Sequence, residues 1–568
     1  MDKFKYLLLI MVILAAGYYL IKNLQDYGSN SMDPDSIILV DITEDAGLSG
    51  HLRPKINDEN PGYLEVMGGG VAVADFDGDG FEDIFFVTMP TFHPDEQEDS
   101  KEFRSALFKN LGDGIFEEIT DEAGLGNIKG YPMGALFFDF NNNGLQDLYV
   151  ASYDGGQLFR NEGGYFIDIT ESAGLSLEGL CGNYPCMAAA ASAADYNRSG
   201  YLDLVIINNV DWDINDPMGY GTMAILPQKY RAQQTFLFEN NGDETFADVS
   251  ESSGITNIDT RGYMEDGKGL SAVWTDVNNN GWPDLFIAND MTPNRLYLNN
   301  RDGTFTDIAI SARVDELKSN MGIDSADFNY NGYLDLVSTN LEGDMTTLFR
   351  NYGDLRYDYA TIYSGLLSSG WGSGWGILFV DLNLNGHLDL AMASGALWQG
   401  RMKERENENI FFRNLGNGNF RNVNEETIQF TNNQISRGSA ILDVNRNGKP
   451  DLIISNLDGA RSQLLLNGAE NTHNWIRLDL EGTLSNRDAV GARVYLERSD
   501  GLIQNQILKA GNSYQSSGSK SLFFGLGLSE VQRLTIEWPS GEVEMYDDVP
   551  VNQILHIREG NHAITSLP

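Results

Sequence analysis

The chain has 568 residues, and its 82 acidic and 38 basic side chains give a formal net charge of −44. Because this charge repels phosphate groups, nucleic acid is excluded as a partner. The acidic excess predicts a solvated surface or an electrostatic field that attracts basic partners.

The chain begins with an export signal. An uninterrupted apolar stretch covers residues 6–21, with Lys3 and Lys5 before it and Lys22 after it. We therefore expect one N-terminal hydrophobic helix within residues 1–22, followed by a polar tether over residues 23–36.

Two fates of this helix remain open. Sixteen residues span only ~24 Å as a helix, against about 30 Å of hydrocarbon, unless Lys5 and Lys22 reach the membrane surface. Alternatively, Ala15 and Gly17 mark a cleavage site for a signal peptide. The anchor is favoured because the apolar run continues beyond that site. Either fate exports the body of the chain, to the periplasm or cell surface if anchored and as a secreted protein otherwise.

A nine-residue acidic motif, D-x-[DN]-x-[DNS]-G-x-x-D, then occurs seven times, each time directly before an apolar strand. We number the copies loops 1 to 7 in chain order. Oxygen side chains at positions 1, 3, 5 and 9 are the ligands that Ca²⁺ prefers, and the glycine at position 6 allows a sharp turn. An EF-hand is excluded, because position 12 lies within a strand and is not Glu, as Phe86 shows in loop 1. The candidate calcium ligands are Asp75, Asp77, Asp79 and Asp83; Asp139, Asn141, Asn143 and Asp147; Asp195, Asn197, Ser199 and Asp203; Asp276, Asn278, Asn280 and Asp284; Asp327, Asn329, Asn331 and Asp335; Asp381, Asn383, Asn385 and Asp389; and Asp443, Asn445, Asn447 and Asp451.

Ligand charge ranks the loops, which predict up to seven Ca²⁺ ions. Loop 1 offers four carboxylates and should bind tightest. The loop at 195–203 should be weakest, because Ser199 replaces a stronger donor and Arg198 adds positive charge. A structural role, in which the ions stabilise the fold, is favoured over signalling. A hairpin turn that its own backbone satisfies is the alternative for any single copy.

The only two cysteines are Cys181 and Cys186. An exported chain favours a local disulfide between them, and their spacing does not support a C-x-x-C redox centre or a zinc site.

Between the loops, residues 107–120, 158–170, 237–250, 296–309 and 411–423 each predict a strand, an Asn/Gly turn and a second strand. One repeat thus supplies four antiparallel strands, which make a propeller blade. We therefore predict an all-β fold with a seven-bladed β-propeller over residues 37–470.

The last repeat lacks its outer strand, and residues 37–48 contain the missing sequence. We expect this N-terminal strand to complete blade seven and so remove an open sheet edge. The insertions at 90–104, 211–234 and 397–407 are candidate recognition loops or plain surface excursions. Residues 473–560 alternate apolar and polar residues and predict a small C-terminal β domain.

The loops and the N-x-G-D-G-x-F hairpins resemble the FG-GAP/VCBS repeats of integrin α-subunit propellers. Residues 267–308 are similar to the cartilage acidic protein family, and residues 474–497, 521–527 and 533–544 resemble the ASPIC/UnbV domain. The resemblance is to a bacterial-type member and places the family's calcium ligands on the Asp and Asn positions named above. Ser199 departs from the pattern, and no cysteine-rich growth-factor-like module follows, so the vertebrate matrix role is not carried over.

Catalytic motifs are weak. The chain has no G-x-S-x-G, its six histidines show no ligand or triad spacing, and residues 262–269 lack the Ser or Thr that a phosphate loop needs. No catalytic residue and no organic cofactor are predicted. The cluster GWGSGWG at 370–376 is either core or a surface for stacking sugars.

The sequence therefore predicts an exported calcium-binding scaffold for protein or glycan binding and adhesion at the cell surface. The alternative is a calcium-dependent enzyme or biosynthetic accessory protein acting on carbohydrate or a secondary metabolite. A third reading makes the propeller a spacer for the terminal domain. A deep central pocket with converging carboxylates would favour the enzyme, whereas a broad binding rim would favour the scaffold.

Overall fold

The computed structural model describes residues 35–50, 56, 62–89, 103–112, 114–215, 227–256, 267–397, 407–427, 433–469 and 472–567. The predicted N-terminal helix and most of the insertions at 90–104 and 397–407 lie outside these residues. In the described parts of the chain, no helix is long and apolar enough to cross a membrane.

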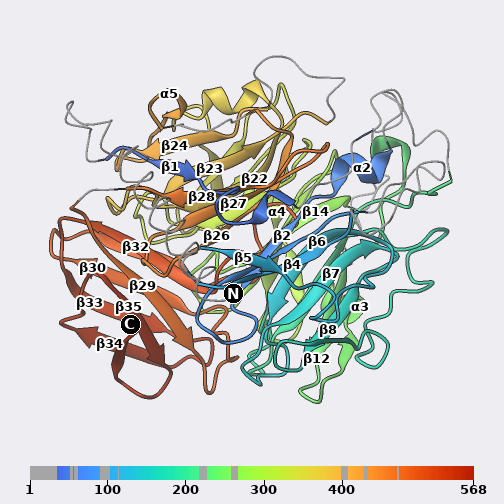
Figure 1. The fold of residues 1–568 in the computed structure, drawn as a ribbon, viewed down its shortest axis with the longest axis horizontal. Coiled ribbons are helices and arrows are strands. Elements are labelled where there is room, and N and C mark those ends of the chain that lie inside the picture. Colours follow the sequence, from blue (N-terminus) through green and yellow to red (C-terminus); the bar gives the residue numbers. More distant parts are fainter. Residues whose placement is uncertain are drawn as a thin grey trace, which may run out of the picture. The chain divides into compact units, whose positions relative to one another are not determined.

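The all-β prediction is confirmed. The described residues between 37 and 469 form seven four-stranded antiparallel sheets, which we call blades 1 to 7, and Figure 1 shows β6, β7 and β8 of one blade side by side. In each blade the acidic loop connects the first two strands, as the repeat predicts. From innermost to outermost strand, the blades are β2 (Val71–Ala74), β3 (Asp83–Phe86), β4 (Ala106–Asn110), β5 (Phe116–Glu118); β6 (Tyr131–Phe138), β7 (Asp147–Tyr153), β8 (Gln157–Asn161), β9 (Phe166–Asp168); β10 (Ala188–Ala194), β11 (Asp203–Asn208), β12 (Phe236–Asn240), β13 (Phe246–Asp248); β14 (Gly269–Thr275), β15 (Asp284–Asn289), β16 (Arg295–Asn299), β17 (Phe305–Asp307); β18 (Ile323–Ala326), β19 (Asp335–Ser338), β20 (Thr347–Asn351), β21 (Tyr357–Tyr359); β22 (Gly374–Val380), β23 (Asp389–Ser394), β24 (Ile410–Asn414), β25 (Phe420–Asn422); and β26 (Ser436–Leu442), β27 (Asp451–Asn456), β28 (Gln463–Asn467), β1 (Leu39–Asp41).

The blades close into a ring. Their innermost strands neighbour one another in the cyclic order β2, β6, β10, β14, β18, β22, β26 and back to β2. As predicted, the N-terminal strand β1 completes blade 7, where it pairs antiparallel with β28 and Leu39 lies opposite Asn467. The ring therefore ends on a pairing between the two ends of the repeat region, which leaves blade 7 with the same four strands as the others.

Apolar residues alternate between the two faces of each blade, as the period of a strand requires. In blade 1, Val71 and Ile84 pack toward blade 7, whereas Ala72 and Phe85 pack toward blade 2. The rings of Phe85 and Phe137 from neighbouring blades meet edge to face, with centroids 6.5 Å apart. Since burying one such side chain contributes about 1.5–3 kcal/mol, the contacts between blades form the core.

Short helical turns connect the strands. They are η1 (Leu48–Gly50), α2 (Tyr63–Met67), η3 (Pro227–Lys229), α3 (Ser250–Ser253), α4 (Ala309–Ala312), η4 (Leu367–Trp371) and α5 (Asn424–Thr427).

Residues 472–567 form a second β structure, which we call the C-terminal module. It contains two four-stranded sheets, and β29 pairs parallel with β35. The sheets, in spatial order, are β32 (Ser521–Gly527), β29 (Asn474–Glu481), β35 (Gln553–Arg558), β36 (Ile564–Leu567); and β31 (Ile503–Ile507), β30 (Arg493–Arg498), β33 (Val531–Glu537), β34 (Val543–Asp547). The propeller and the module belong to one compact unit, Ile37–Pro568.

The connection between β31 and β32 enters the centre of the ring. We call residues 508–520 the channel segment. Its backbone forms hydrogen bonds of 2.7–3.2 Å with the innermost strands of blades 1, 2, 3, 5 and 7, through Val73, Ala135, Ala193, Ile323 and Ile441. Because five blades bond one short segment, the module fastens the propeller from inside.

Tyr514 is the apolar anchor of the channel segment. It is fully buried, packs in one cluster with Tyr63 and Met67 of α2, and meets the Trp375 ring edge to face at 5.0 Å. The Arg437 guanidinium lies 3.7 Å from the centre of the Trp375 ring. Trp375 is thus core, whereas Trp371 of the same sequence cluster is 58% exposed.

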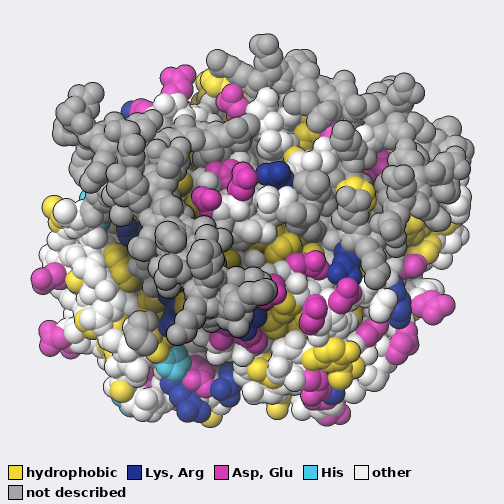
Figure 2. Space-filling view, in the orientation of Figure 1, with side chains coloured by type: hydrophobic (Ala, Val, Ile, Leu, Met, Phe, Trp, Pro, Cys, Tyr) yellow, Lys and Arg dark blue, Asp and Glu magenta, His cyan; other side chains and the backbone are white. Residues whose placement is uncertain are grey.

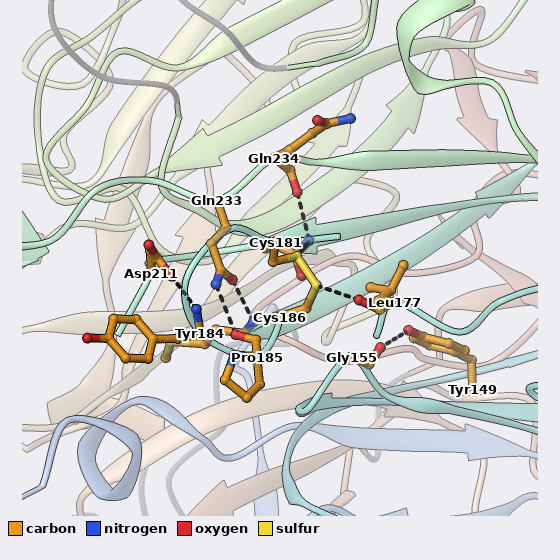
Figure 3. Close-up of a disulfide and its surroundings, with 12 residues drawn as sticks. Tyr149, Gly155, Leu177, Cys181, Tyr184, Pro185, Cys186, Asp211, Gln233 and Gln234 are labelled. Carbon is orange, nitrogen blue, oxygen red and sulfur yellow. Dashed lines mark hydrogen bonds between the residues drawn. A yellow bond between two sulfur atoms is a disulfide. The ribbon is translucent and has the colours of Figure 1, made fainter. Parts of the chain in front are cut away.

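The predicted disulfide joins Cys181 to Cys186, with a Cα–Cα distance of 5.0 Å. Figure 3 shows the small loop that it closes and the residues that hold it. Gln233 Nε2 donates a hydrogen bond to the Pro185 carbonyl at 2.9 Å, and the Tyr184 N–H donates to Asp211 at 3.1 Å. These hydrogen bonds hold the disulfide-closed loop, which leads into β10, against the connection between β11 and β12.

Candidate metal centres

All seven loops adopt one turn. In each, the N–H of the position-6 glycine donates to the position-1 carboxylate at 2.7–2.9 Å. The side-chain oxygen at position 5 accepts the N–H of position 7, and Ser199 does so at 3.2 Å. Every position-6 glycine has a positive φ between 77° and 93°, as the sequence predicted. Loop 3 therefore keeps the shared shape in spite of its different ligand.

Position 4 is a second left-handed residue, which the sequence motif did not indicate. Its φ is 55–59° in loops 2 to 7, and Gly78 has 76° in loop 1. In loops 2 to 5 the position-4 side chain donates to the position-6 carbonyl of the next loop. Asn142 donates to Gly200 O at 2.8 Å, and Asn279 donates to Gly332 O at the same distance. Neighbouring loops are thus bonded directly to one another.

The acid at position 9 is fully buried in every loop. In loop 1, Asp83 Oδ2 accepts the Phe76 N–H at 3.1 Å, and its Oδ1 accepts the Asn110 N–H at 2.8 Å. Burial raises the pKa of Asp83 to about 9 and those of Asp147 and Asp284 to about 8. An ionised carboxylate at such a site is costly unless a nearby positive charge compensates it, so these positions suit a cation.

An asparagine in each hairpin also belongs to the site, although it was not predicted. Asn240 is representative. Its Nδ2 donates to Leu202 O of its own loop at 3.0 Å and to Phe140 O of the preceding loop at 2.8 Å. The same pair of bonds recurs around the whole ring, including blade 7 to blade 1, and is made by Asn110, Asn161, Asn240, Asn299, Asn351, Asn414 and Asn467.

Loop 1 brings three of its four predicted carboxylates together. Oxygen atoms of Asp75, Asp77 and Asp83 lie within 4.8 Å of one another, which is unique to this loop among the described residues. Asp79 stands outside this group and, like Asp77, pairs with Lys109, whose Nζ is 3.1 Å from Asp79. Because each carboxylate oxygen accepts about two bonds, the turn hydrogen bonds leave lone pairs for a hard cation. The donor set fits Ca²⁺, which would compete with Lys109 for Asp77.

Each of the other loops offers two carboxylates. In two of these loops an arginine side chain lies close to a carboxylate. Arg477 of the C-terminal module lies 3.0 Å from Asp443 Oδ2 in loop 7, and Arg493 lies 3.5 Å from Asp276 Oδ2 in loop 4. In loop 3, Arg198 donates to Gly281 O of loop 4. Loops 4 and 7 should therefore bind a cation more weakly than their own ligands suggest.

On the face in view, Figure 2 shows acidic side chains spread out, several of them beside a Lys or Arg.

Two family models match this architecture. The FG-GAP-like repeat model matches residues 75–150, 139–206 and 276–338, which contain loops 1 to 5, and the ASPIC and UnbV model matches residues 482–564. The chain carries FG-GAP repeats and an ASPIC/UnbV domain. The C-terminal module contains this ASPIC/UnbV domain.

The curated relatives agree with this assignment. Cartilage acidic protein 1 of Xenopus tropicalis is 23% identical over 513 residues, covering 86% of this chain and 72% of the relative. The Homo sapiens protein is 23% identical over 518 residues, covering 87% and 72%. The resemblance predicted from the repeats and the C-terminal strands is confirmed.

Solved structures resemble the chain more distantly. An Agrocybe aegerita lectin that recognises non-reducing terminal N-acetylglucosamine has a TM-score of 0.39 and 17% identity, covering 69% of this chain and 86% of the lectin. BBS1N in complex with ARL6DN has a TM-score of 0.40 and 10% identity, covering 73% and 98%.

The ASPIC/UnbV domain contacts the FG-GAP loops directly. Asp488 accepts the Asp139 N–H at 2.9 Å and the Gln146 Nε2 at 2.6 Å, both in loop 2. The Arg487 N–H donates to Asn142 of the same loop at 2.8 Å. The turn at 485–493 thus holds the domain against the propeller.

Proposed function

We propose that this chain is an exported calcium-binding propeller that serves as a scaffold for protein or glycan binding at the cell surface. The observation that carries the proposal is the convergence of Asp75, Asp77 and Asp83 in loop 1. Six further loops repeat its turn with fewer carboxylates. Ca²⁺ accepts six to eight oxygen ligands in flexible geometry, so a site of this composition suits it better than a softer metal.

Calcium would stabilise the ring. The position-9 carboxyls are buried, and burial penalises their ionised form, so a cation bound at neutral pH offsets part of that penalty. Any ion that binds the native state and not the unfolded chain also adds stability by mass action. Because neighbouring loops are hydrogen bonded, an ion in one loop stiffens the contacts between blades.

Two observations support export. The apolar stretch at residues 6–21 has the character of a signal sequence or anchor. The Cys181–Cys186 disulfide is typical of proteins outside the cytoplasm, where weak calcium loops also find sufficient free ion.

The channel segment favours a scaffold over the catalytic alternative. A catalytic propeller of the predicted kind needs a deep central pocket with converging carboxylates, whereas residues 508–520 bond the innermost strands of five blades. In the described residues, the centre of the ring is therefore occupied by the chain itself.

Calcium titration tests the proposal. Protein freed of metal with a chelator is titrated with Ca²⁺ by calorimetry, and its melting temperature is measured with and without Ca²⁺. We expect Asp77→Ala to weaken the tightest site and to lower the melting temperature mainly in calcium, whereas Ser199→Ala changes both only slightly. Equal effects of the two variants would contradict the ranking, and no heat of binding in the wild type would contradict calcium binding itself.

Binding arrays then test the scaffold. The chain is applied to glycan and protein arrays with calcium and with chelator. Interactions that survive chelation unchanged would reject calcium-dependent recognition.

A further inference from the structure

A cavity of about 290 Å³ lies between blades 3 and 4 and the C-terminal module. We call it the tryptophan cavity, because Trp274 of β14, Trp282 of loop 4 and Trp538 of the module all line it. Three of the eight tryptophans of the chain thus meet at one site. Aromatic rings with a few polar groups are the usual lining of a small-molecule site.

The charges that line the tryptophan cavity are balanced. Arg493 donates to Asn279 Oδ1 at 2.5 Å and to Gly332 O at 3.0 Å. The guanidinium of Arg198 lies 4.5 Å from the centre of the Trp282 ring. Asp276 and Glu537 also line the cavity, so two acids balance two guanidiniums. Arg493 is therefore engaged, whereas Arg198 Nε is buried without a partner among the described residues. The balance of two acids and two guanidiniums favours an uncharged ligand.

Not every polar group in the lining residues reaches a ligand. The indole N–H groups of Trp274 and Trp538 and the hydroxyl of Thr275 are buried without a hydrogen-bond partner among the described residues. These three atoms are enclosed by the protein and do not face the cavity, so they do not bond a ligand there. Glu537 is exposed at the edge and can accept bonds from hydroxyl groups.

The size of the cavity limits the ligand. Its volume is at the low end of the roughly 300–1,000 Å³ typical of ligand sites, so one sugar ring is accommodated and a folded peptide is not. A hexose combines the required properties: it is uncharged, it presents a C–H face to an indole, and its hydroxyls both donate and accept.

We propose that the tryptophan cavity binds one uncharged hexose unit of a glycan. This inference rests on the proposed scaffold function and specifies its ligand class. The cavity joins both parts of the chain, so a bound sugar would contact the FG-GAP propeller and the C-terminal module together.

The experiment uses the full chain labelled with 5-fluorotryptophan and observed by ¹⁹F NMR. Trp→Phe variants assign the resonances of Trp282 and Trp538. The probes are the methyl glycosides of glucose, galactose, mannose and N-acetylglucosamine, with methyl glucuronide as the charged comparison. We expect at least one neutral glycoside to shift both resonances and to leave that of Trp371, which is exposed elsewhere, unchanged.

Two variants separate stacking from hydrogen bonding. Because an aromatic contact contributes about 0.5–1.5 kcal/mol, Trp282→Ala should weaken binding by up to about tenfold, whereas Trp371→Ala should not. Glu537→Gln keeps the rings and should also reduce affinity. Resonances that stay in place for every neutral glycoside, or tighter binding of the glucuronide, would overturn the inference. Calcium binding in the same sample shows whether the proposed function survives that outcome.

Discussion

The hairpin asparagines give the sharpest test of how the ring is held together. Asn240 is 5% exposed and donates its two Nδ2 hydrogens to Leu202 O and Phe140 O, which belong to neighbouring loops. Its Oδ1 also accepts the Gly242 N–H at 2.9 Å. Asn240→Ala removes all three bonds and leaves two buried carbonyls short of a donor.

The adjacent residue provides a matched control. Asn241 has the same side chain but is exposed, and among the described residues that side chain donates only to Thr245 Oγ1, at 2.9 Å. Since each unsatisfied buried group costs about 1–3 kcal/mol, Asn240→Ala should lower the free energy of unfolding by about 2–5 kcal/mol. Asn241→Ala should change it by less than about 0.5 kcal/mol.

Urea unfolding followed by circular dichroism measures both variants under the same conditions. The midpoint should fall clearly for Asn240→Ala, with an unchanged slope, and should stay at the wild-type value for Asn241→Ala. Equal midpoints for the two variants would refute the view that this asparagine fastens one blade to the next.

Three further predictions concern separate parts of the fold. Tyr514→Ala should destabilise the chain by about 3–5 kcal/mol, because it empties the core of the channel segment, whereas the exposed Tyr165→Ala should have little effect in the same urea assay. Burial raises the pKa of Asp290 to about 7, so the native state keeps this proton to a higher pH than the unfolded chain does. The free energy of unfolding of the wild type should therefore fall relative to that of Asp290→Asn as the pH rises from about 4 to 7. Parallel pH profiles of the two proteins would contradict this. Cys181→Ser opens the small loop that the disulfide closes and should lower the free energy of unfolding by about 2 kcal/mol. A reducing agent should lower the melting temperature of the wild type but not that of the variant.

Much of the propeller could be predicted because its signals are local and repeated. A nine-residue loop before each apolar strand and an Asn/Gly turn in each hairpin fix the order of strands within a blade. The strand at Leu39–Asp41 was found as the piece missing from the last repeat, and its pairing with β28 is confirmed. Repetition supports these predictions, because the same pattern of loop and hairpin occurs several times along the chain.

Contacts between distant segments could not be predicted in the same way. The channel segment reads as a polar linker, and nothing in its sequence indicates that Tyr514 is buried inside the ring. The hairpin asparagines did carry a signal, since Asn recurs just before each turn, but its bond to the preceding loop depends on how the blades are placed. Trp371 and Trp375 lie four residues apart and have opposite environments because only the second is on an inner strand.

The central claim is that the acidic loops hold calcium, and an anomalous difference map from crystals grown with Ca²⁺ tests it most directly. We predict the strongest peak in loop 1, within about 2.3–2.6 Å of oxygens from Asp75, Asp77 and Asp83. Weaker peaks are expected in the Asn-containing loops, with the weakest at residues 195–203. A map without a peak in any loop at saturating Ca²⁺ would contradict the account.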